Sequence, residues 1–449
     1  MNRVLTAALI TTLFAPLFVV GQTITSVSDG LFYFPTTWDC LCIPAPQSGQ
    51  NVVIDHVVTL NNAIGVYGGT LTIHGQGALL QDGTPRQLHV SNGGSVVNQG
   101  LFTVDQIWVQ NGSFDNTGTA TIRTFFNEQT LTNAGLILGV DSFLNTGAIT
   151  NSTAAIIEVG TFQNNDQLHN LGTIQFVDSL FNTGSLHNDV DAMLQADSLL
   201  NTGSLINDGT MQLISLMNTG GQTNTGTITA NDLLNTGTFE NHGSMLCNGS
   251  LANMGNMTNH TDASIQIEES FLNADQDPPV PFGQALFTNN GSVQVDHSWY
   301  NFANIAGDAP GSFVVQDSTV NAGALTGTFD LCDMSPQTTV PPIIDINLGT
   351  VEPGITYCTL PSGIGSTQRS APLFRFEPST RIFTLEQPQQ DWRNAHVRVH
   401  DALARTVRDL PVQGSTSIHL DLSTLRSGAY MVTVTSSAAP PWTTRLVLP

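Results

Sequence analysis

Residues 198–209 read Ser198-Leu199-Leu200-Asn201-Thr202-Gly203-Ser204-Leu205-Ile206-Asn207-Asp208-Gly209, and variants of this stretch recur between about Asn92 and Asn259. Apolar residues, asparagine and glycine fall on alternate positions, which is the pattern of β-strands whose successive side chains point to opposite faces. We expect the leucines at 199 and 205 and both asparagines to point inward. The bulky residues at 200 and 206 break the polar outer set and indicate corners or a partly covered outer face.

Two polar positions recur once in every copy. The first is asparagine in ten copies spaced 17 to 19 residues apart, at Asn98, Asn116, Asn133, Asn151, Asn170, Asn188, Asn207, Asn224, Asn241 and Asn259. The second lies six residues earlier, at Asn92, Gln110, Asn127, Asn145, Asn164, Asn182, Asn201, Asn218, Asn235 and Asn253. A fixed period near 20 residues is typical of a solenoid, in which each unit packs only against its neighbours.

Stacked asparagines have a structural explanation. Strands in adjacent coils lie about 4.8 Å apart, so identical amides in one column can hydrogen-bond to each other along it. The sequence therefore predicts an all-β protein, a parallel β-helix with about 18 residues per coil, held by asparagine ladders. Its handedness and the number of faces per coil stay open, although the crossover rule favours the right-handed form. Wider-spaced copies at 271–273, 299–301 and 319–321 extend it.

The charge distribution divides the chain. All 12 basic residues are arginine, and 35 acidic residues give a net charge of −23, which excludes sequence-independent binding to nucleic acid phosphates. Residues 124–368 contain 23 acidic side chains and no basic one, whereas residues 369–449 contain nine arginines and six acids. We therefore expect two differently built domains, joined by a linker at 333–372.

The N-terminus predicts export. Residues 1–21 place Arg3 before the apolar run Val4–Val20, the pattern of a secretory signal peptide. No second apolar run of about 20 residues follows, so we expect no transmembrane span in the mature chain. Residues 22–90 contain Thr37-Trp38 and an alternating stretch at 51–60. They resemble a block that caps the first β-helix coil in secreted Bacteroidetes surface proteins. We assign 22–90 to this cap and the first coils, and 91–332 to the repeats with asparagine ladders.

The last 77 residues, 373–449, carry a second resemblance. They contain an alternating Val397-Arg398-Val399 strand and a segment with Asp421, Leu422, Leu425, Gly428 and Tyr430, before a final basic-apolar strand. This pattern resembles the C-terminal sorting domain of type IX secretion substrates in Bacteroidetes. The resemblance implies a small β-sandwich, the type IX machinery as partner, and secretion or display on the outer-membrane surface.

Cysteines and stacked polar pairs are the remaining candidate sites. Cys332 and Cys358 are the candidate disulfide, Cys247 is expected to be a buried thiol, and Cys40 and Cys42 stand too close to pair easily with each other, so their pairing is open. Two histidine pairs and two aspartate pairs could hold a metal, structural calcium included, and lie at His169/His187, His242/His260, Asp189/Asp191 and Asp275/Asp277. No catalytic or cofactor-binding residue is assigned.

These features predict a non-enzymatic rod, an adhesin or extracellular matrix component that contacts glycans or surfaces. The alternative is a carbohydrate-active β-helix enzyme, a polysaccharide lyase or glycoside hydrolase, or a carbohydrate-binding module. A lyase needs cations beside its uronate substrate, but the chain has no lysine and no arginine between Arg123 and Arg369. Inverting hydrolases need clustered carboxylates, and the acids here are scattered.

Overall fold

The computed structural model describes residues 23–275 and 285–359, and seven segments near the C-terminus: 373–377, 382–386, 395–401, 406–412, 417–425, 428–436 and 439–448. The chain divides into two compact units, Met1–Pro361 and Ser362–Pro449. The predicted signal peptide lies outside the described residues. Among the residues that are described, no helix has the length and apolar character needed to cross a bilayer.

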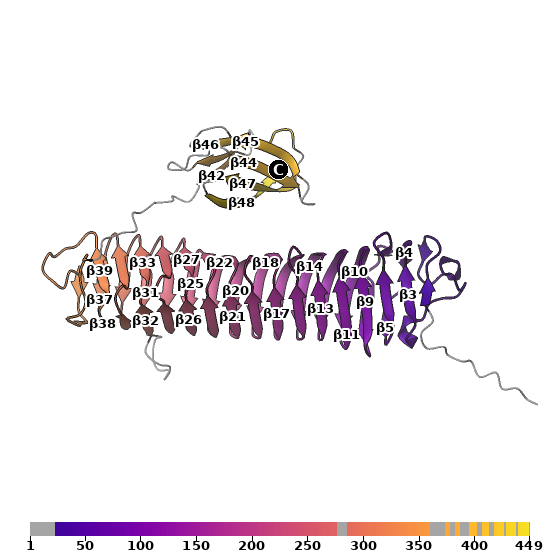
Figure 1. The fold of residues 1–449 in the computed structure, drawn as a ribbon, viewed down its shortest axis with the longest axis horizontal. Coiled ribbons are helices and arrows are strands. Elements are labelled where there is room, and N and C mark those ends of the chain that lie inside the picture. Colours follow the sequence, from indigo (N-terminus) through magenta and orange to yellow (C-terminus); the bar gives the residue numbers. More distant parts are fainter. Residues whose placement is uncertain are drawn as a thin grey trace, which may run out of the picture. The chain divides into compact units, whose positions relative to one another are not determined.

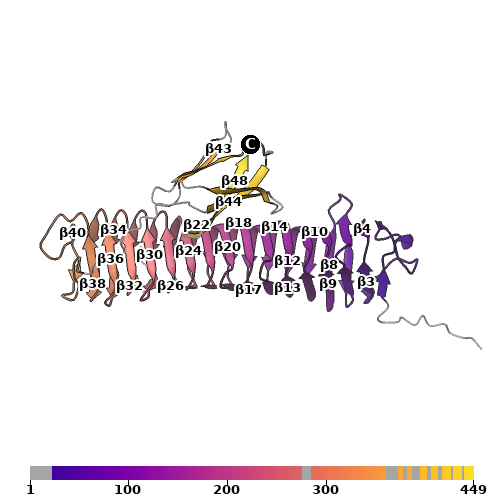
Figure 2. The ribbon, with the colours of Figure 1, turned by 45° about the horizontal axis from the view of Figure 1, so that its top comes forward.

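The first unit is the predicted parallel β-solenoid, with about 14 turns of about 19 residues each (Figure 1). Every strand pair in it is parallel, and each strand pairs with the one a turn before and a turn after. A turn has three strand-bearing faces, as in the turn built from Thr238–Asn241, Ser244–Cys247 and Leu251–Asn253. The rows of stacked strands along the solenoid can also be followed in a view turned by 45° (Figure 2). The number of faces, which the sequence left open, is therefore three.

The first face is a sheet of 17 strands. Its strands are β1 (Thr23–Thr25), β3 (Asn51–Ile54), β6 (Thr70–Ile73), β9 (Gly94–Asn98), β11 (Gly112–Asn116), β13 (Thr130–Asn133), β15 (Ala148–Asn151), β17 (Gln167–Asn170), β19 (Ser185–Asn188), β21 (Ser204–Asn207), β23 (Gly221–Asn224), β26 (Thr238–Asn241), β29 (Asn256–Asn259), β32 (Leu286–Asn289), β35 (Asn304–Gly307), β38 (Ala324–Gly327) and β41 (Thr350–Val351).

The second and third faces merge in the middle of the solenoid, where one long strand per turn crosses both. These strands are β10 (Leu101–Val109), β12 (Thr119–Asn127), β14 (Leu136–Asn145), β16 (Ile156–Asn164), β18 (Thr173–Asn182), β20 (Met193–Asn201) and β22 (Thr210–Asn218).

Elsewhere the two faces have separate strands. The second face has β2 (Gly30–Leu31), β4 (Val57–Leu60), β7 (Ala78–Gln81), β24 (Thr227–Ala230), β27 (Ser244–Cys247), β30 (Ser264–Ile267), β33 (Ser292–Val295), β36 (Ser312–Val315) and β39 (Asp330–Asp333). The third has β5 (Ile64–Tyr67), β8 (Gln87–Ser91), β25 (Asp232–Asn235), β28 (Leu251–Asn253), β31 (Phe271–Asn273), β34 (Trp299–Asn301), β37 (Thr319–Asn321) and β40 (Ile346–Asn347).

The core follows from the alternation in the sequence. Every second side chain of a strand points inward, and equivalent positions stack from turn to turn. Phe125, Phe143 and Phe162 form one such stack, with ring centroids 4.5 and 4.7 Å apart. The corner glycines leave room for the neighbouring turn, since a Cβ on Gly203 would lie 2.1 Å from the backbone oxygen of Gly184.

The N-terminal end of the solenoid contains two 3-10 turns, η1 (Pro35–Thr37) and η2 (Pro46–Ser48). Trp38, next to η1, is completely buried. Its indole Nε1 donates a hydrogen bond to the carbonyl of Phe32 at 2.8 Å, and the two rings meet edge to face. The segment containing Thr37-Trp38 therefore packs at the first turns, where the resemblance placed a cap.

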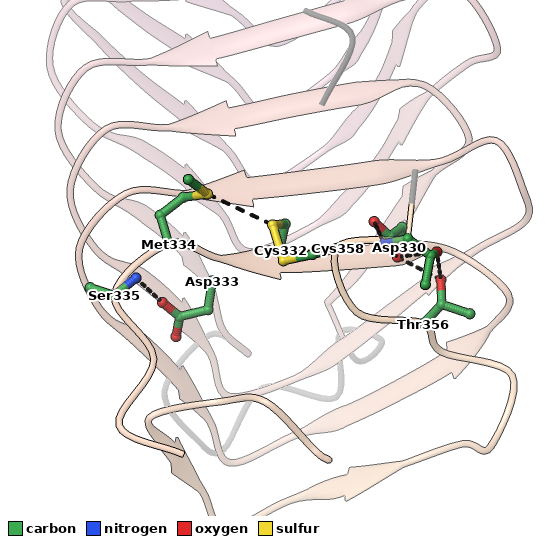
Figure 3. Close-up of a disulfide and its surroundings, with 8 residues drawn as sticks. Asp330, Cys332, Asp333, Met334, Ser335, Thr356 and Cys358 are labelled. Carbon is green, nitrogen blue, oxygen red and sulfur yellow. Dashed lines mark hydrogen bonds between the residues drawn. A yellow bond between two sulfur atoms is a disulfide. The ribbon is translucent and has the colours of Figure 1, made fainter. Parts of the chain in front are cut away.

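The C-terminal end of the solenoid extends further than the sequence predicted. Residues 333–372 were assigned to a linker, but β40 and β41 lie within that range and pair with β37 and β38 as a further turn. The disulfide between Cys332 and Cys358 closes this end, beside Asp330 and Asp333 (Figure 3). The Pro-rich insertion that separates Asn321 from Asn347 hides the repeat, because it lengthens this turn to 26 residues.

The second unit contains two antiparallel sheets. Three strands form the first, β42 (Leu373–Glu377), β43 (Ile382–Glu386) and β46 (Ser417–Asp421). Four form the second, in the order β45 (Thr406–Val412), β44 (Ala395–Asp401), β47 (Gly428–Ser436) and β48 (Ala439–Leu448). Alternate residues of the central strands, such as Val397, Val399, Val432 and Val434, are buried.

Candidate functional site

The asparagines form two buried columns in which each side-chain Nδ2 donates to the Oδ1 of the next turn at 2.7–2.9 Å. The first column holds Asn98, Asn116, Asn133, Asn151, Asn170, Asn188, Asn207, Asn224, Asn241, Asn259 and Asn289. The second holds Asn127, Asn145, Asn164, Asn182, Asn201, Asn218, Asn235, Asn253, Asn273, Asn301 and Asn321, and it ends at the exposed Asn347.

The second column differs at its start from the sequence alignment. The strand register places Val109, not Gln110, under Asn127, and Asn92 occupies a left-handed turn with φ 55°. The column therefore begins at Asn127, whose Oδ1 has no hydrogen-bond partner among the described residues. The alignment places the second position six residues before each first-column asparagine, but Val109 lies seven residues before Asn116, so one residue more separates the two positions in this turn.

Inside each column, the ladder amides have no hydrogen-bonding capacity left for a ligand. Asn207 is typical, because its Nδ2 donates to Asn224 Oδ1 at 2.7 Å and also approaches the carbonyls of Gly209 and Thr227, both at 3.2 Å. Its side chain is completely buried. Any binding function must therefore lie on the outer faces.

The third face carries an outward row of mostly apolar side chains, one per turn, each directly before a second-column asparagine or, in the first turn of the row, before Val109. We call this row the apolar stripe. Its members are Trp108, Phe126, Leu144, Phe181, Leu200, Met217, Leu234, Ala252, Leu272, Tyr300, Val320 and Ile346, with Gln163 as the one polar interruption. Phe181 and Met217 expose 41% and 38% of their surface. Leu200, interpreted from the sequence as a sign of a corner or a partly covered outer face, is a half-buried member of this row.

Hydroxyl groups flank the apolar stripe on both sides. Two residues before it along the chain runs a row of small hydroxyl residues, at Thr124, Ser142, Thr161, Ser179, Ser198 and Ser215. Two residues after it come threonines such as Thr202 and Thr219, whose hydroxyls donate to ladder backbone carbonyls. Sequence analysis missed this arrangement, because a row across turns becomes visible only once the strand register is known.

One edge of the first face carries a group of two histidines and a carboxylate. Glu240 is the last outward-pointing residue of β26. His242 and His260 each follow a first-column asparagine, in two adjacent turns. One ligand atom from each of the three lies within 4.8 Å of the others. The rings of His242 and His260 stack with centroids 3.7 Å apart, and His260 Nε2 donates to Glu240 Oε2 at 2.6 Å.

A second group on the same edge contains the other stacked pair. The rings of His169 and His187 lie 5.1 Å apart. Each imidazole has its own carboxylate, because His169 Nε2 donates to Asp189 Oδ2 at 2.9 Å and His187 Nε2 to Asp208 Oδ2 at 2.8 Å. The bond from His169 lowers the pKa of Asp189, and a bond from Thr225 Oγ1 lowers that of Asp208.

Of the four aspartates in the predicted calcium pairs, one lies in a group of three metal-ligand side chains among the described residues. Asp189 is grouped with histidines, and Asp191 belongs to none of the metal-ligand groups of three that the described residues form. Asp275 Oδ1 accepts a hydrogen bond from the backbone of Ala285. Asp277 lies outside the described residues.

The cysteines correct one expectation. Cys40 and Cys42 are joined by a disulfide, although the sequence suggested that they stand too close to pair with each other. The left-handed backbone of Leu41, with φ 52°, turns the two residues toward one another, and their Cα atoms lie 5.1 Å apart, within the usual range for a disulfide. Cys247 is the free cysteine, and complete burial raises its pKa to about 12.

The predicted sorting motif spans the connection from β46, in the three-stranded sheet of the second unit, to β47, in its four-stranded sheet. Asp421 ends β46, Leu422 is buried, and the backbone N–H of Leu425 donates to the carbonyl of Leu422. Gly428 opens β47, and Tyr430 on that strand pairs with Asp401 and Leu446 on either side.

Residues 377–448 match the family model of the secretion system C-terminal sorting domain. No curated protein and no solved structure matches the chain. The resemblance drawn from the sequence is therefore confirmed for the C-terminal unit: the chain is a secreted β-helix protein with a type IX sorting domain, exported to the cell surface or beyond it.

Proposed function

We propose that this protein is a non-enzymatic adhesin or extracellular matrix component that binds extended neutral polysaccharide chains through the apolar stripe. The stripe carries the proposal. Monomeric soluble proteins rarely expose a long contiguous apolar surface, and those that do use it for binding. Thirteen turns at about 4.8 Å give a row on the order of 60 Å long, which suits an extended polymer rather than a small ligand.

The chemistry of the face supports a sugar polymer. A pyranose ring presents apolar C–H groups on its faces and hydroxyls around its edge. The face presents an apolar row beside a row of hydroxyl residues, with threonines on the other side in five turns, at Thr146, Thr183, Thr202, Thr219 and Thr236. Each contact is weak, but contacts repeated along one rod add through effective concentration. Charge favours a neutral polymer, since residues 124–368 have 23 acidic side chains and no basic one and would repel an acidic chain.

The same charge pattern argues against catalysis on the solenoid. A polysaccharide lyase must neutralise a uronate carboxylate, and no lysine or arginine is available between Arg123 and Arg369. The outward-pointing residues instead repeat from turn to turn. Such a repeat favours many equivalent contacts with a polymer over a single reaction centre.

The test compares two variants of the full chain in binding to insoluble neutral polysaccharides. Phe181→Ser/Leu200→Ser/Met217→Ser interrupts the stripe, and Ile206→Ser/Leu286→Ser is the matched control, with 38% and 36% exposed side chains on the first face. We expect the stripe variant to lose about tenfold or more in affinity, at about 1.4 kcal/mol per factor of ten, and the control to bind normally. The proposal would be overturned if both variants bound equally, if the stripe variant lost self-association instead of polysaccharide binding, or if the protein released reducing or unsaturated ends from the polymer.

A further inference from the structure

We propose that Glu240, His242 and His260 form a binding site for one divalent transition-metal ion of the Zn²⁺ class, on the outer edge of the first face. The three side chains come from two adjacent turns and bring two imidazole nitrogens and one carboxylate oxygen within 4.8 Å of one another. This inference is independent of the polysaccharide contact, because the site lies on a different face from the apolar stripe.

The ligand set decides the class of metal. Zn²⁺ binds histidine nitrogen at about 2.0–2.1 Å and carboxylate oxygen at about 2.0–2.2 Å, usually with four ligands in a tetrahedron. Two histidines and one glutamate supply three of these, and water fills the fourth position. Calcium and magnesium prefer oxygen ligands alone, so two imidazoles select against them.

The solenoid holds the ligands close to the required positions. His242 and His260 directly follow the ladder residues Asn241 and Asn259. The ladder bond from Asn241 Nδ2 to Asn259 Oδ1, at 2.9 Å, therefore holds the two turns together beside the two histidines. Only side-chain rotations are then needed to bring the three ligand atoms to metal-binding distances. The ion takes the place of the proton between His260 Nε2 and Glu240 Oε2, and the neutral ring then carries its one proton on Nδ1, by exchange with solvent, so that it binds as imidazole.

His242 is the ligand that the present contacts do not occupy. It is exposed, it stacks on His260, and no hydrogen bond or ion pair to its ring is found among the described residues. The surrounding charge is favourable as well, because the acidic solenoid raises the local concentration of cations and no lysine or arginine between residues 124 and 368 competes for Glu240.

The other stacked pair provides a matched control. His169 and His187 each donate Nε2 to a separate carboxylate, Asp189 and Asp208. Both imidazoles therefore already have a partner, and their rings lie further apart than those of His242 and His260, at 5.1 Å against 3.7 Å.

The experiment is a calorimetric titration of the full chain, without a polyhistidine tag, with Zn²⁺ and separately with Ca²⁺, followed by the visible absorption spectrum with Co²⁺. We expect one equivalent of Zn²⁺ that His242→Ala/His260→Ala removes and His169→Ala/His187→Ala leaves in place. Glu240→Gln, which keeps the side-chain shape, should weaken binding by about tenfold or more. The Co²⁺ spectrum should show the strong bands of a tetrahedral site.

Three results would overturn the assignment. These are Zn²⁺ binding that survives His242→Ala/His260→Ala unchanged, binding lost only in His169→Ala/His187→Ala, and binding of Ca²⁺ as tight as that of Zn²⁺. Because all the substituted side chains lie at the surface, each variant should keep the thermal midpoint of the metal-free parent, which separates loss of a ligand from loss of the fold.

Discussion

Gln222 occupies an apolar position of the core. In the register of the first face it lies between Leu205 and Phe239. Its side chain is buried, and neither Oε1 nor Nε2 has a hydrogen-bond partner among the described residues. A buried amide in this state costs stability, because it has lost its hydrogen bonds to water without replacing them.

We therefore expect Gln222→Leu to raise the free energy of unfolding by about 1–3 kcal/mol. The measurement is urea unfolding followed by circular dichroism, with Gln212→Leu on the exposed surface as the control, which should change stability little. A destabilised Gln222→Leu protein would show that the amide has partners that the structure does not reveal.

Cys247 tests both the core and the disulfides. Because burial raises its pKa to about 12, the reactive thiolate is nearly absent from the folded protein. We expect no reaction with Ellman's reagent at pH 8 in the native state and one thiol per chain in denaturant, since the other four cysteines are paired. Three or five thiols in denaturant would contradict one or both disulfides, and rapid labelling of the native protein would contradict the buried position.

At the scale of the element, the asparagine ladder should be most sensitive in its middle. Asn207→Ala removes a donor to Asn224 and an acceptor for Asn188, which leaves buried polar atoms on both neighbours. Asn127→Ala leaves such an atom on Asn145 alone, because Asn127 begins its column and its own Oδ1 is unpaired.

We expect Asn207→Ala to lower the free energy of unfolding by about 2–4 kcal/mol and Asn127→Ala by about 1 kcal/mol. Thermal and urea unfolding of the two variants against the parent would measure the difference. Equal losses would mean that the amides act independently rather than as a column.

The ladder shows which features the sequence makes predictable. The asparagines repeat as identical residues at a nearly constant spacing, so the period alone reveals the solenoid, and even widely spaced copies such as Asn273 and Asn301 can be recognised. Asn289 and Asn347 follow insertions, which lengthen the spacing to 30 and 26 residues and conceal the repeat.

The candidate sites were less predictable, for a physical reason. The sequence paired His242 with His260 because they share one position in consecutive copies, but Glu240 belongs to a different position and joins them only across the corner. The apolar stripe likewise depends on the lateral register of strands. The pairing of Cys40 with Cys42 depends on the left-handed backbone of Leu41, and residues other than glycine enter that region too seldom for a prediction.

At the scale of the whole molecule, the two units should separate in function. The solenoid has its own continuous core and falls in one compact unit, Met1–Pro361, while residues 377–448 match the sorting domain. Folding of the rod and recognition by the export machinery therefore depend on different parts of the chain.

Deletion of residues 377–448 should abolish display at the cell surface without unfolding the rod. The chain would be expressed in a cell that has the type IX machinery, and its location followed by fractionation and by protease treatment of whole cells. Leu422→Asp is the companion variant, because a charge at this buried position should unfold the sorting domain alone. We expect both proteins to remain inside the outer membrane with the β-sheet circular dichroism of the solenoid intact. Surface display of the deleted chain at the parental level would show that export depends on the solenoid, and loss of the solenoid signal would show that the two units fold as one.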